Sequence, residues 1–359
     1  MVHDPIRILI VDDSRIFRGV LESVLAGIPD VVVVGSVFNG DKALEFIQSN
    51  RVDLATLDIE MPGKNGIETL RAIRELNRKR PTNSQTETLL VSSLTTQGAR
   101  CTVEGLQLGA IDFVLKPSGG TEAENLAVLQ KTMLEKLAIY RQKSLGIRET
   151  ATRLTTPPRP SIHAGSYRAI AIGISTGGPE TLAKLLPDLA GKTVVPIFII
   201  QHIQHGMSRY LSESLSKKVG YPIVEAQQGT VVMSGGIYMA QSGSHMILRH
   251  LAGQISIGLS NAPAENHSRP SVDVFLRSAA AVYGPSLIAA IMTGMLNDGA
   301  SGVRVVKRAG GVVLAQDQAS SVIWGMPRAA IETGAVDFVL PLEKIAPAFL
   351  SLIQGAIPK

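Results

Sequence analysis

The sequence has little cysteine and few aromatic side chains: one cysteine, Cys101, and 4% aromatic residues in 359. A single cysteine cannot form a disulfide within the chain and cannot supply a metal site built from several cysteines. No uninterrupted apolar run approaches the roughly 18 residues that a membrane-spanning helix needs. The first ten residues, MVHDPIRILI, contain an acidic residue and no small-residue cleavage site, unlike a signal peptide. We therefore expect a cytoplasmic protein.

Excess charge is also absent from most of the chain. The formal net charge is +5, and residues 131–160 hold seven lysines and arginines against two glutamates, so this segment carries the whole excess. A nucleic-acid-binding surface is expected on a folded face with stacking aromatic side chains. A basic segment rich in threonine and proline is more typical of a solvated linker. We therefore expect no nucleic-acid partner.

The length favours two domains. Residues 5–125 contain five apolar runs of strand length, separated by helical patterns: IRILIV, VVVVGSV, VDLATL, TLLVSS and DFVLKP. This alternation predicts a doubly wound α/β domain with a parallel sheet. The first helical pattern is predicted to bury one face, made of Ile16, Phe17, Val20, Leu21, Val24 and Leu25.

A second α/β region is predicted over residues 166–357, after a helix and a basic, Pro- and Thr-rich linker over residues 126–165. The sheet of this region is expected to be mostly parallel. HMILRH and QISIGL, separated by Leu251-Ala-Gly, predict a hairpin. The other strand candidates are RAIAIGIS, VPIFIIQHI, GGIYMA, SLIAAIMTG and GVVLAQ.

Four charged residues stand at predicted strand ends of the first domain. Asp12 and Asp13 follow the first strand, Asp58 ends the third, and Lys116 ends the fifth. The carboxyl ends of parallel strands share one crevice, so these side chains are expected to converge. Clustered carboxylates suit a hard divalent cation such as Mg²⁺, and an aspartate beside Mg²⁺ can accept a phosphoryl group.

These motifs, together with MPGKNG after Asp58, resemble response-regulator receiver domains, which have the flavodoxin-like fold. The resemblance implies that Asp58 is the phospho-acceptor and that Mg²⁺ binds to Asp12, Asp13 and Asp58. It also implies a histidine kinase of the chemotaxis type as phosphodonor. The other implied positions belong to the conformational switch of the family: Ser92, Phe113 and Lys116.

Ser175 is the candidate nucleophile of the second domain. It lies in AIAIGISTGGPE, where an apolar strand ends and a Gly-Gly-Pro segment opens a helix. The glycines let backbone N–H groups approach a ligand, and a helix N-terminus can stabilise a developing oxyanion. Residues 173–177 also match the G-x-S-x-G pattern. The same turn is compatible with phosphate binding, so Ser175 needs a base to indicate catalysis.

His202 and Asp298 are the candidate base and acid. His202 ends the strand VPIFIIQHI, with His205 as a rival three residues later, and Asp298 follows the strand SLIAAIMTG. In one parallel sheet these strand ends can meet, giving a nucleophile, a general base and an orienting carboxylate. The order Ser, His, Asp differs from the Ser, Asp, His order of α/β-hydrolases, so the elbow pattern does not assign that fold.

From residue 167 to 355 the chain resembles the catalytic domain of the chemotaxis protein-glutamate methylesterases, the CheB family. The resemblance implies Ser175, His202 and Asp298 as the triad, with Thr176 and Met295 at the oxyanion. It implies phosphorylation-activated demethylation of chemoreceptor glutamates, with deamidation of receptor glutamines, no cofactor for the esterase, and membrane contact only through the receptors. The matching stretches are GISTGGPETL, IIQH, RPSVDVFLRSAA, IMTGMLNDGASG, AQDQASSVIWGMPRAAI and GAVDFVLPL.

Three departures and three alternatives accompany this resemblance. Leu296 stands where the family usually has glycine, QHIQHGMS replaces the usual segment after the strand, and His205 stands where the family usually has no histidine. There are three alternatives to this function. The second domain could be a binding module of a response regulator, a nucleotide-binding domain, or an esterase that acts on a non-chemotaxis signalling protein. GISTGG lacks the second spacing of G-x-G-x-x-G, which disfavours the nucleotide-binding alternative.

Overall fold

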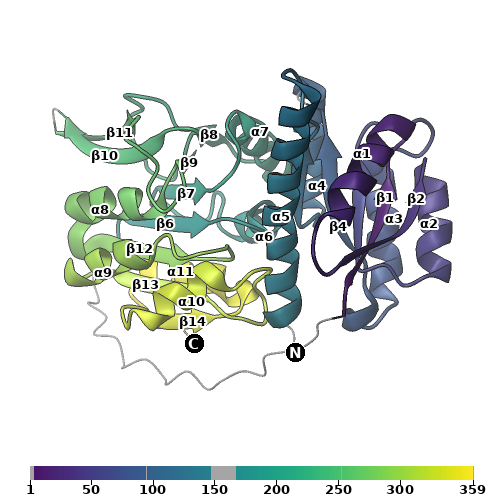
Figure 1. Ribbon diagram of the computed structural model, residues 1–359. Helices are drawn as coiled ribbons and strands as arrows, with labels where there is room; N and C mark the ends of the chain where they lie inside the picture. Colours follow the sequence, from purple (N-terminus) through teal and green to yellow (C-terminus); the bar gives the residue numbers. More distant parts are fainter. Residues whose placement is uncertain (1–3, 94, 147–166, 252, 359) are drawn as a thin grey trace. The chain divides into compact units, whose positions relative to one another are not determined.

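The computed structural model describes residues 4–93, 95–146, 167–251 and 253–358. The chain forms two compact units, Met1–Arg141 and Gln142–Lys359 (Figure 1). Most of the expected linker, residues 147–166, lies outside the described residues. Within those ranges no helix is both long enough and apolar enough to cross a membrane.

The first unit contains a five-stranded parallel sheet in the order β2-β1-β3-β4-β5. All five strands were predicted from the apolar runs, and the order is that of the flavodoxin-like fold. The order in which strands are added to the sheet changes direction between β1 and β3. The carboxyl ends of these two strands therefore flank the crevice where such folds bind ligands. The strands are β1 (Ile6–Val11), β2 (Val31–Val37), β3 (Leu54–Asp58), β4 (Glu87–Ser92) and β5 (Asp112–Leu115).

The helix α1 shows where the predicted apolar face was wrong. Its N-cap Ser14 accepts a hydrogen bond from Phe17 N–H, 3.3 Å, and the helix buries Leu21, Val24 and Leu25. Ile16 is 82% exposed, because at 3.6 residues per turn it lies about 80° or more from each buried side chain. The helices are α1 (Arg15–Ala26), α2 (Gly40–Ser49), α3 (Gly66–Arg78), α4 (Thr96–Gln107) and α5 (Glu122–Gly146).

The second unit contains a seven-stranded parallel sheet in the order β14-β13-β12-β6-β7-β9-β8, and a separate antiparallel hairpin, β10 with β11, as predicted. The three-residue strands β8 and β14 were not predicted. The switch point lies between β6 and β12, the strands that precede the Ser175 and Asp298 segments. The strands are β6 (Ala169–Ile174), β7 (Ile197–Gln201), β8 (Ile223–Glu225), β9 (Ile237–Met239), β10 (His245–Leu251), β11 (Gln254–Ser260), β12 (Leu287–Ile291), β13 (Val312–Gln316) and β14 (Phe338–Leu340).

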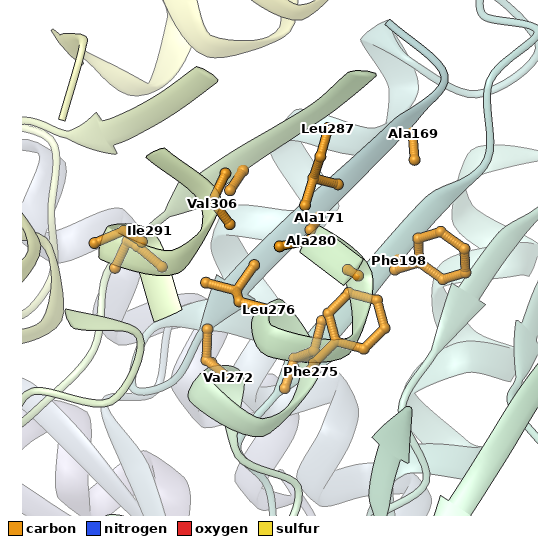
Figure 2. Packing of buried hydrophobic residues seen from close by; sticks show 14 of the residues in the cluster. Ala169, Ala171, Phe198, Val272, Phe275, Leu276, Ala280, Leu287, Ile291 and Val306 are labelled. Carbon is orange, nitrogen blue, oxygen red and sulfur yellow. The ribbon is translucent and has the colours of Figure 1, made fainter. Parts of the chain in front are cut away.

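Packing of α8 against the sheet places its N-terminus beside the end of β6. Figure 2 shows Phe275 and Leu276 of α8 among side chains of the sheet, and the rings of Phe275 and Phe198 lie 5.3 Å apart. A Cβ at Gly173 would lie 2.4 Å from Val272 Cγ1, so glycine is required there for this approach. The helices are α6 (Gly178–Leu185), α7 (Met207–Val219), α8 (Val272–Tyr283), α9 (Ala300–Arg308), α10 (Gly325–Glu332) and α11 (Leu342–Ile353).

Candidate functional site

The first unit brings together the four charged residues predicted to converge. Asp12, Asp13 and Asp58 each offer a carboxylate oxygen, and these oxygens lie within 4.8 Å of one another. Lys116 Nζ lies 2.8 Å from Asp12 Oδ2 and 2.9 Å from Asp58 Oδ2. Asp12 and Asp58 are buried, whereas Asp13 is exposed at the rim. The cluster therefore opens to solvent on one side, where a small ligand can enter.

Negative charge exceeds positive charge in this pocket. Burial of the Asp58 carboxyl, reinforced by the nearby charge of Asp12 and only partly offset by Lys116, raises its pKa to about 6. Three carboxylates sharing one ammonium group form the kind of oxygen-rich, charge-deficient cluster that a divalent cation stabilises. The residues present thus fit the Mg²⁺ that receiver domains use.

The predicted switch residues Ser92, Phe113 and Lys116 lie on or directly after β4 and β5, the two strands that follow β3 across the sheet. Ser92 ends β4, is 1% exposed, and accepts a hydrogen bond from Thr102 Oγ1 of α4, 2.8 Å. Its own hydroxyl donates to Ser93 O, 3.2 Å, so it faces α4 in this structure. Phe113 of β5 is 3% exposed. Ser92 and Lys116 therefore stand at the same sheet edge as Asp58, at the ends of β4 and β5.

In the second unit, Ser175 lies directly after β6, and the loop after β12 passes beside it. Ser175 N–H donates to Thr293 O, 2.9 Å, and a Cβ at Gly294 would lie 2.7 Å from Ser175 Cβ. Glycine at 294 thus lets the β12–α9 loop pass directly alongside the candidate nucleophile. Thr293 Oγ1 also donates to Thr176 O, 2.9 Å, which ties the two loops together.

His202, rather than His205, lies next to the candidate acid. His202 follows β7, and its Nε2 lies 2.8 Å from Asp298 Oδ2. His205 Nδ1 instead lies 3.2 Å from Ser242 O, away from the carboxylate. Because Asp298 accepts a hydrogen bond from Nε2, the ring nitrogen that remains to accept a proton from the candidate nucleophile is Nδ1. Ser268 Oγ lies 3.3 Å from that nitrogen.

Hydrogen bonds saturate the Asp298 carboxylate. Its side chain is 2% exposed. Burial alone would raise its pKa, but the hydrogen bonds, led by that of His202, outweigh burial and lower the pKa to about 2. Two of the backbone donors open α8, whose N-terminus favours negative charge. The six donors are His202 Nε2 (2.8 Å), Val272 N (2.7 Å), Asn266 Nδ2 (2.9 Å), Ser271 Oγ (2.9 Å), Gly299 N (3.0 Å) and Asp273 N (3.1 Å).

Two backbone N–H groups in the loops that carry or adjoin Ser175 are the predicted oxyanion donors. In the described ranges, neither Thr176 N–H nor Met295 N–H has a hydrogen-bond acceptor. Thr176 follows the candidate nucleophile, and Met295 follows Gly294 in the adjoining loop. Donors fixed in place where negative charge develops are the arrangement that stabilises a tetrahedral intermediate.

Leu296 adopts the backbone conformation of a glycine. Its φ is +65° and its side chain is 52% exposed. A left-handed conformation costs a leucine roughly 1–2 kcal/mol, and glycine avoids that cost. The β12–α9 loop therefore keeps the left-handed turn with leucine in the position where the family usually has glycine, at the expense of local strain.

Several residues of the site were not found from the sequence. Asn266, Ser268 and Ser271 contact His202 or Asp298 from the segment before α8. Buried His245 accepts a hydrogen bond from Ser271 N–H, 3.1 Å, and supports the same segment. For Ser271 the sequence signal was the stretch RPSVDVFLRSAA, residues 269–280, which matched the family but suggested no role; Asn266 and Ser268 lie before that stretch and had no signal. The first helical turn of the stretch holds the acid.

Comparison with known proteins shows which family the chain is similar to. A family model described as CheB methylesterase matches residues 170–349, half of the chain. The chain belongs to the CheB methylesterase family. A model described as response regulator receiver domain matches residues 8–127. The protein is thus a hydrolase of the methylesterase type that also carries a receiver domain.

Similar full-length proteins share both parts. A protein-glutamate methylesterase/protein-glutamine glutaminase of Nocardioides sp. strain JS614 is 38% identical over 98% of this chain and 97% of its own length. The protein of the same name from Thermotoga maritima is 36% identical over 98% of this chain and all of its own. The crystal structure of the T. maritima CheB methylesterase catalytic domain covers 52% of this chain and 100% of that chain, with a TM-score of 0.51 and 36% identity.

Proposed function

We propose that this CheB family member is a phosphorylation-activated protein-glutamate methylesterase that demethylates chemoreceptor glutamates and also deamidates receptor glutamines. The observation that carries the proposal is the hydrogen bond of 2.8 Å between His202 and the saturated carboxylate of Asp298, one strand away from Ser175. The domains are a receiver over residues 5–125, a helix and linker over 126–165, and the catalytic domain over 166–357.

Acylation begins when Ser175 Oγ attacks the carbonyl carbon of the glutamate methyl ester. His202 Nδ1 takes the hydroxyl proton, and Asp298 stabilises the imidazolium through Nε2. The carbonyl oxygen becomes an oxyanion, which the N–H groups of Thr176 and Met295 bind. When the intermediate collapses, the C–O bond to the methoxy group breaks, and the same nitrogen gives its proton to the departing methoxy oxygen, which leaves as methanol.

Deacylation repeats the steps with water as the nucleophile. His202 removes a proton from water as its oxygen attacks the glutamyl ester of Ser175, and the imidazolium then protonates the departing serine oxygen. The products are the glutamate carboxylic acid, which ionises, and free enzyme. A receptor glutamine follows the same route, with ammonia in place of methanol.

In the receiver domain, Asp58 is proposed as the phospho-acceptor. Lys116, 2.9 Å from Asp58 Oδ2, is positioned to pair with a phosphoryl oxygen. Ser92 would turn from α4 toward that group, with a coupled shift of Phe113. Asp12, Asp13 and Asp58 would hold Mg²⁺, which neutralises charge on the transferred phosphoryl group when it is bound.

The partners follow from these two sites. The phosphodonor is a histidine kinase of the chemotaxis type, and the substrates are the cytoplasmic domains of chemoreceptors. We place the protein in the cytoplasm, at the membrane only through these receptors. The alternative, an esterase that acts on a non-chemotaxis signalling protein, differs from this proposal only in its substrate. The experiment below distinguishes the two substrates.

Release of methanol from methyl-labelled chemoreceptor tests the proposal. Ser175→Ala removes the nucleophile, and we expect a loss of at least about 10³-fold with the fold retained. His205→Ala is the control: it removes the histidine three residues after His202, in the β7–α7 loop but outside the proposed triad, and its rate should stay within about threefold of wild type. Equal damage by both substitutions, or release by Ser175→Ala at the wild-type rate, would overturn the assignment. A wild type that cleaves p-nitrophenyl acetate but not methylated receptor points to another substrate.

A further inference from the structure

Gln201, the last residue of β7, makes two hydrogen bonds that bear on the catalytic geometry. The residue is 2% exposed. Its Nε2 donates to Ser175 O, 2.9 Å, and to His202 O, 2.8 Å. One side-chain amide thus uses both of its N–H bonds on the backbone carbonyls of the candidate nucleophile and the candidate base.

The orientation of this amide is dictated by its surroundings. If the amide flipped, Oε1 would face the carbonyl oxygens of Ser175 and His202 and no donor would remain for either. In the observed orientation Oε1 is buried, and no donor among the described residues reaches it. Oε1 lies beside the first turn of α6, where a Cβ at Gly178 would be 2.0 Å away, and the positive end of the helix dipole favours the oxygen there.

We propose that Gln201 is a positioning residue that sets the relative placement of Ser175 and His202. Beside the parallel pairing of β6 with β7, the hydrogen bond from His202 N–H to Ile174 O, 2.9 Å, ties the two strand ends together. That bond fixes the strands, whereas both catalytic residues lie one residue beyond them. The Gln201 amide extends the coupling past the ends of β6 and β7. The inference rests on the proposed triad.

Gln201→Met tests this role, because methionine keeps the length and shape of the side chain and removes both donors. We expect kcat for p-nitrophenyl acetate to fall by roughly 10- to 100-fold, since small misplacements of catalytic groups have effects of that size. The second-order rate of Ser175 labelling by a fluorophosphonate should fall in parallel. KM for methylated receptor should change less than threefold, because Gln201 is buried away from substrate.

A control separates positioning from loss of stability. Leu352, 0% exposed in α11, lies outside the site, and Leu352→Ala lowers stability without touching the triad. The rate per folded molecule should match wild type for Leu352→Ala and fall for Gln201→Met. Gln201→Glu should be at least as slow as Gln201→Met, because its carboxylate repels both carbonyl oxygens. Wild-type labelling and turnover by folded Gln201→Met would overturn the inference. Failure of wild type to be labelled at Ser175 would instead overturn the proposed function.

Discussion

The two units place carboxylates at the same point of the same kind of fold, yet treat them in opposite ways. Asp298, near the β6–β12 switch point, receives six hydrogen bonds, and its pKa is lowered to about 2. Asp58, near the β1–β3 switch point, shares Lys116 with Asp12, and its pKa is raised to about 6. One carboxylate is saturated with donors, and the other is short of positive charge.

The two carboxylate environments suit two different tasks. A saturated carboxylate stays ionised and holds one imidazole orientation throughout a catalytic cycle. A charge-deficient cluster responds to a cation and to a phosphoryl group, because both change its charge balance and the contacts of neighbouring side chains. We therefore propose that the catalytic unit is the fixed unit and the receiver unit the responsive one, although both use parallel sheets.

The largest expected effect comes from neutralising the saturated carboxylate. Asp298→Asn keeps the size of the side chain but presents an NH₂ group to donors, so the imidazole loses its orientation. We expect methanol release to fall roughly 10³- to 10⁴-fold. Asp58→Asn is the matched control, because basal release should be unchanged and only stimulation by a phosphodonor lost. Similar basal rates for the two variants would break the comparison.

Mg²⁺ should stabilise the first unit alone. At a concentration one hundred times its Kd, a ligand that binds only the folded state adds about 2.7 kcal/mol. Trp324, the sole tryptophan, lies in the second unit and reports that unit's unfolding by fluorescence. We expect Mg²⁺ to shift a far-UV circular dichroism transition while the tryptophan transition stays in place. A Mg²⁺-dependent shift of the tryptophan transition that persists in Asp12→Ala would locate the ion elsewhere.

Acid should weaken the second unit over a defined range. The pKa of Asp298 is lowered from 3.8 to about 2 in the folded state, so its ionised form stabilises the fold. This contribution is complete above about pH 4, falls as the pH drops from about 4 to 2, and is worth about 2 kcal/mol. Urea unfolding followed by Trp324 fluorescence measures it. The difference between wild type and Asp298→Asn should shrink across this range, and a constant difference would contradict the lowered pKa.

The smallest effect concerns strain in the fixed site. Leu296→Gly relieves the left-handed conformation at φ +65°, and the gain is partly offset by the greater entropy of glycine in the unfolded chain. We expect the free energy of unfolding to rise by at most about 1 kcal/mol, measured by urea unfolding. Leu296→Asn, which also tolerates this conformation, is the control. A loss above about 1 kcal/mol in both variants would show that the exposed side chain makes stabilising contacts.

Much of the fold followed from the sequence because its long apolar runs have strand length. β6 and β7, for example, are buried at every position and are flanked by turn signals. The strands β8 and β14 have three residues each, too short for a pattern to stand out. Ile16 shows the complementary limit, since an apolar residue at the edge of a helical stripe can face solvent.

The sequence predicted which strand ends carry the residues of the candidate site, but not the hydrogen bonds that join them. Ser175, His202 and Asp298 each follow a strand of one parallel sheet, which sequence order and topology rules could anticipate. Which ring nitrogen of His202 contacts Asp298 depends on side-chain orientation, which no pattern encodes. Asn266 and Ser271 reach Asp298 from 32 and 27 residues away because α8 packs against β6, a tertiary contact.

The receiver unit is proposed to control the catalytic unit, and the initial rate of methanol release measures that control. The full-length protein is incubated with methyl-labelled chemoreceptor, and the initial rate of methanol release is compared with and without Mg²⁺ and acetyl phosphate. We predict that the phosphodonor raises the rate in wild type and has no effect in Asp58→Asn. A wild-type rate that is unchanged while Asp58 is demonstrably phosphorylated would contradict the account.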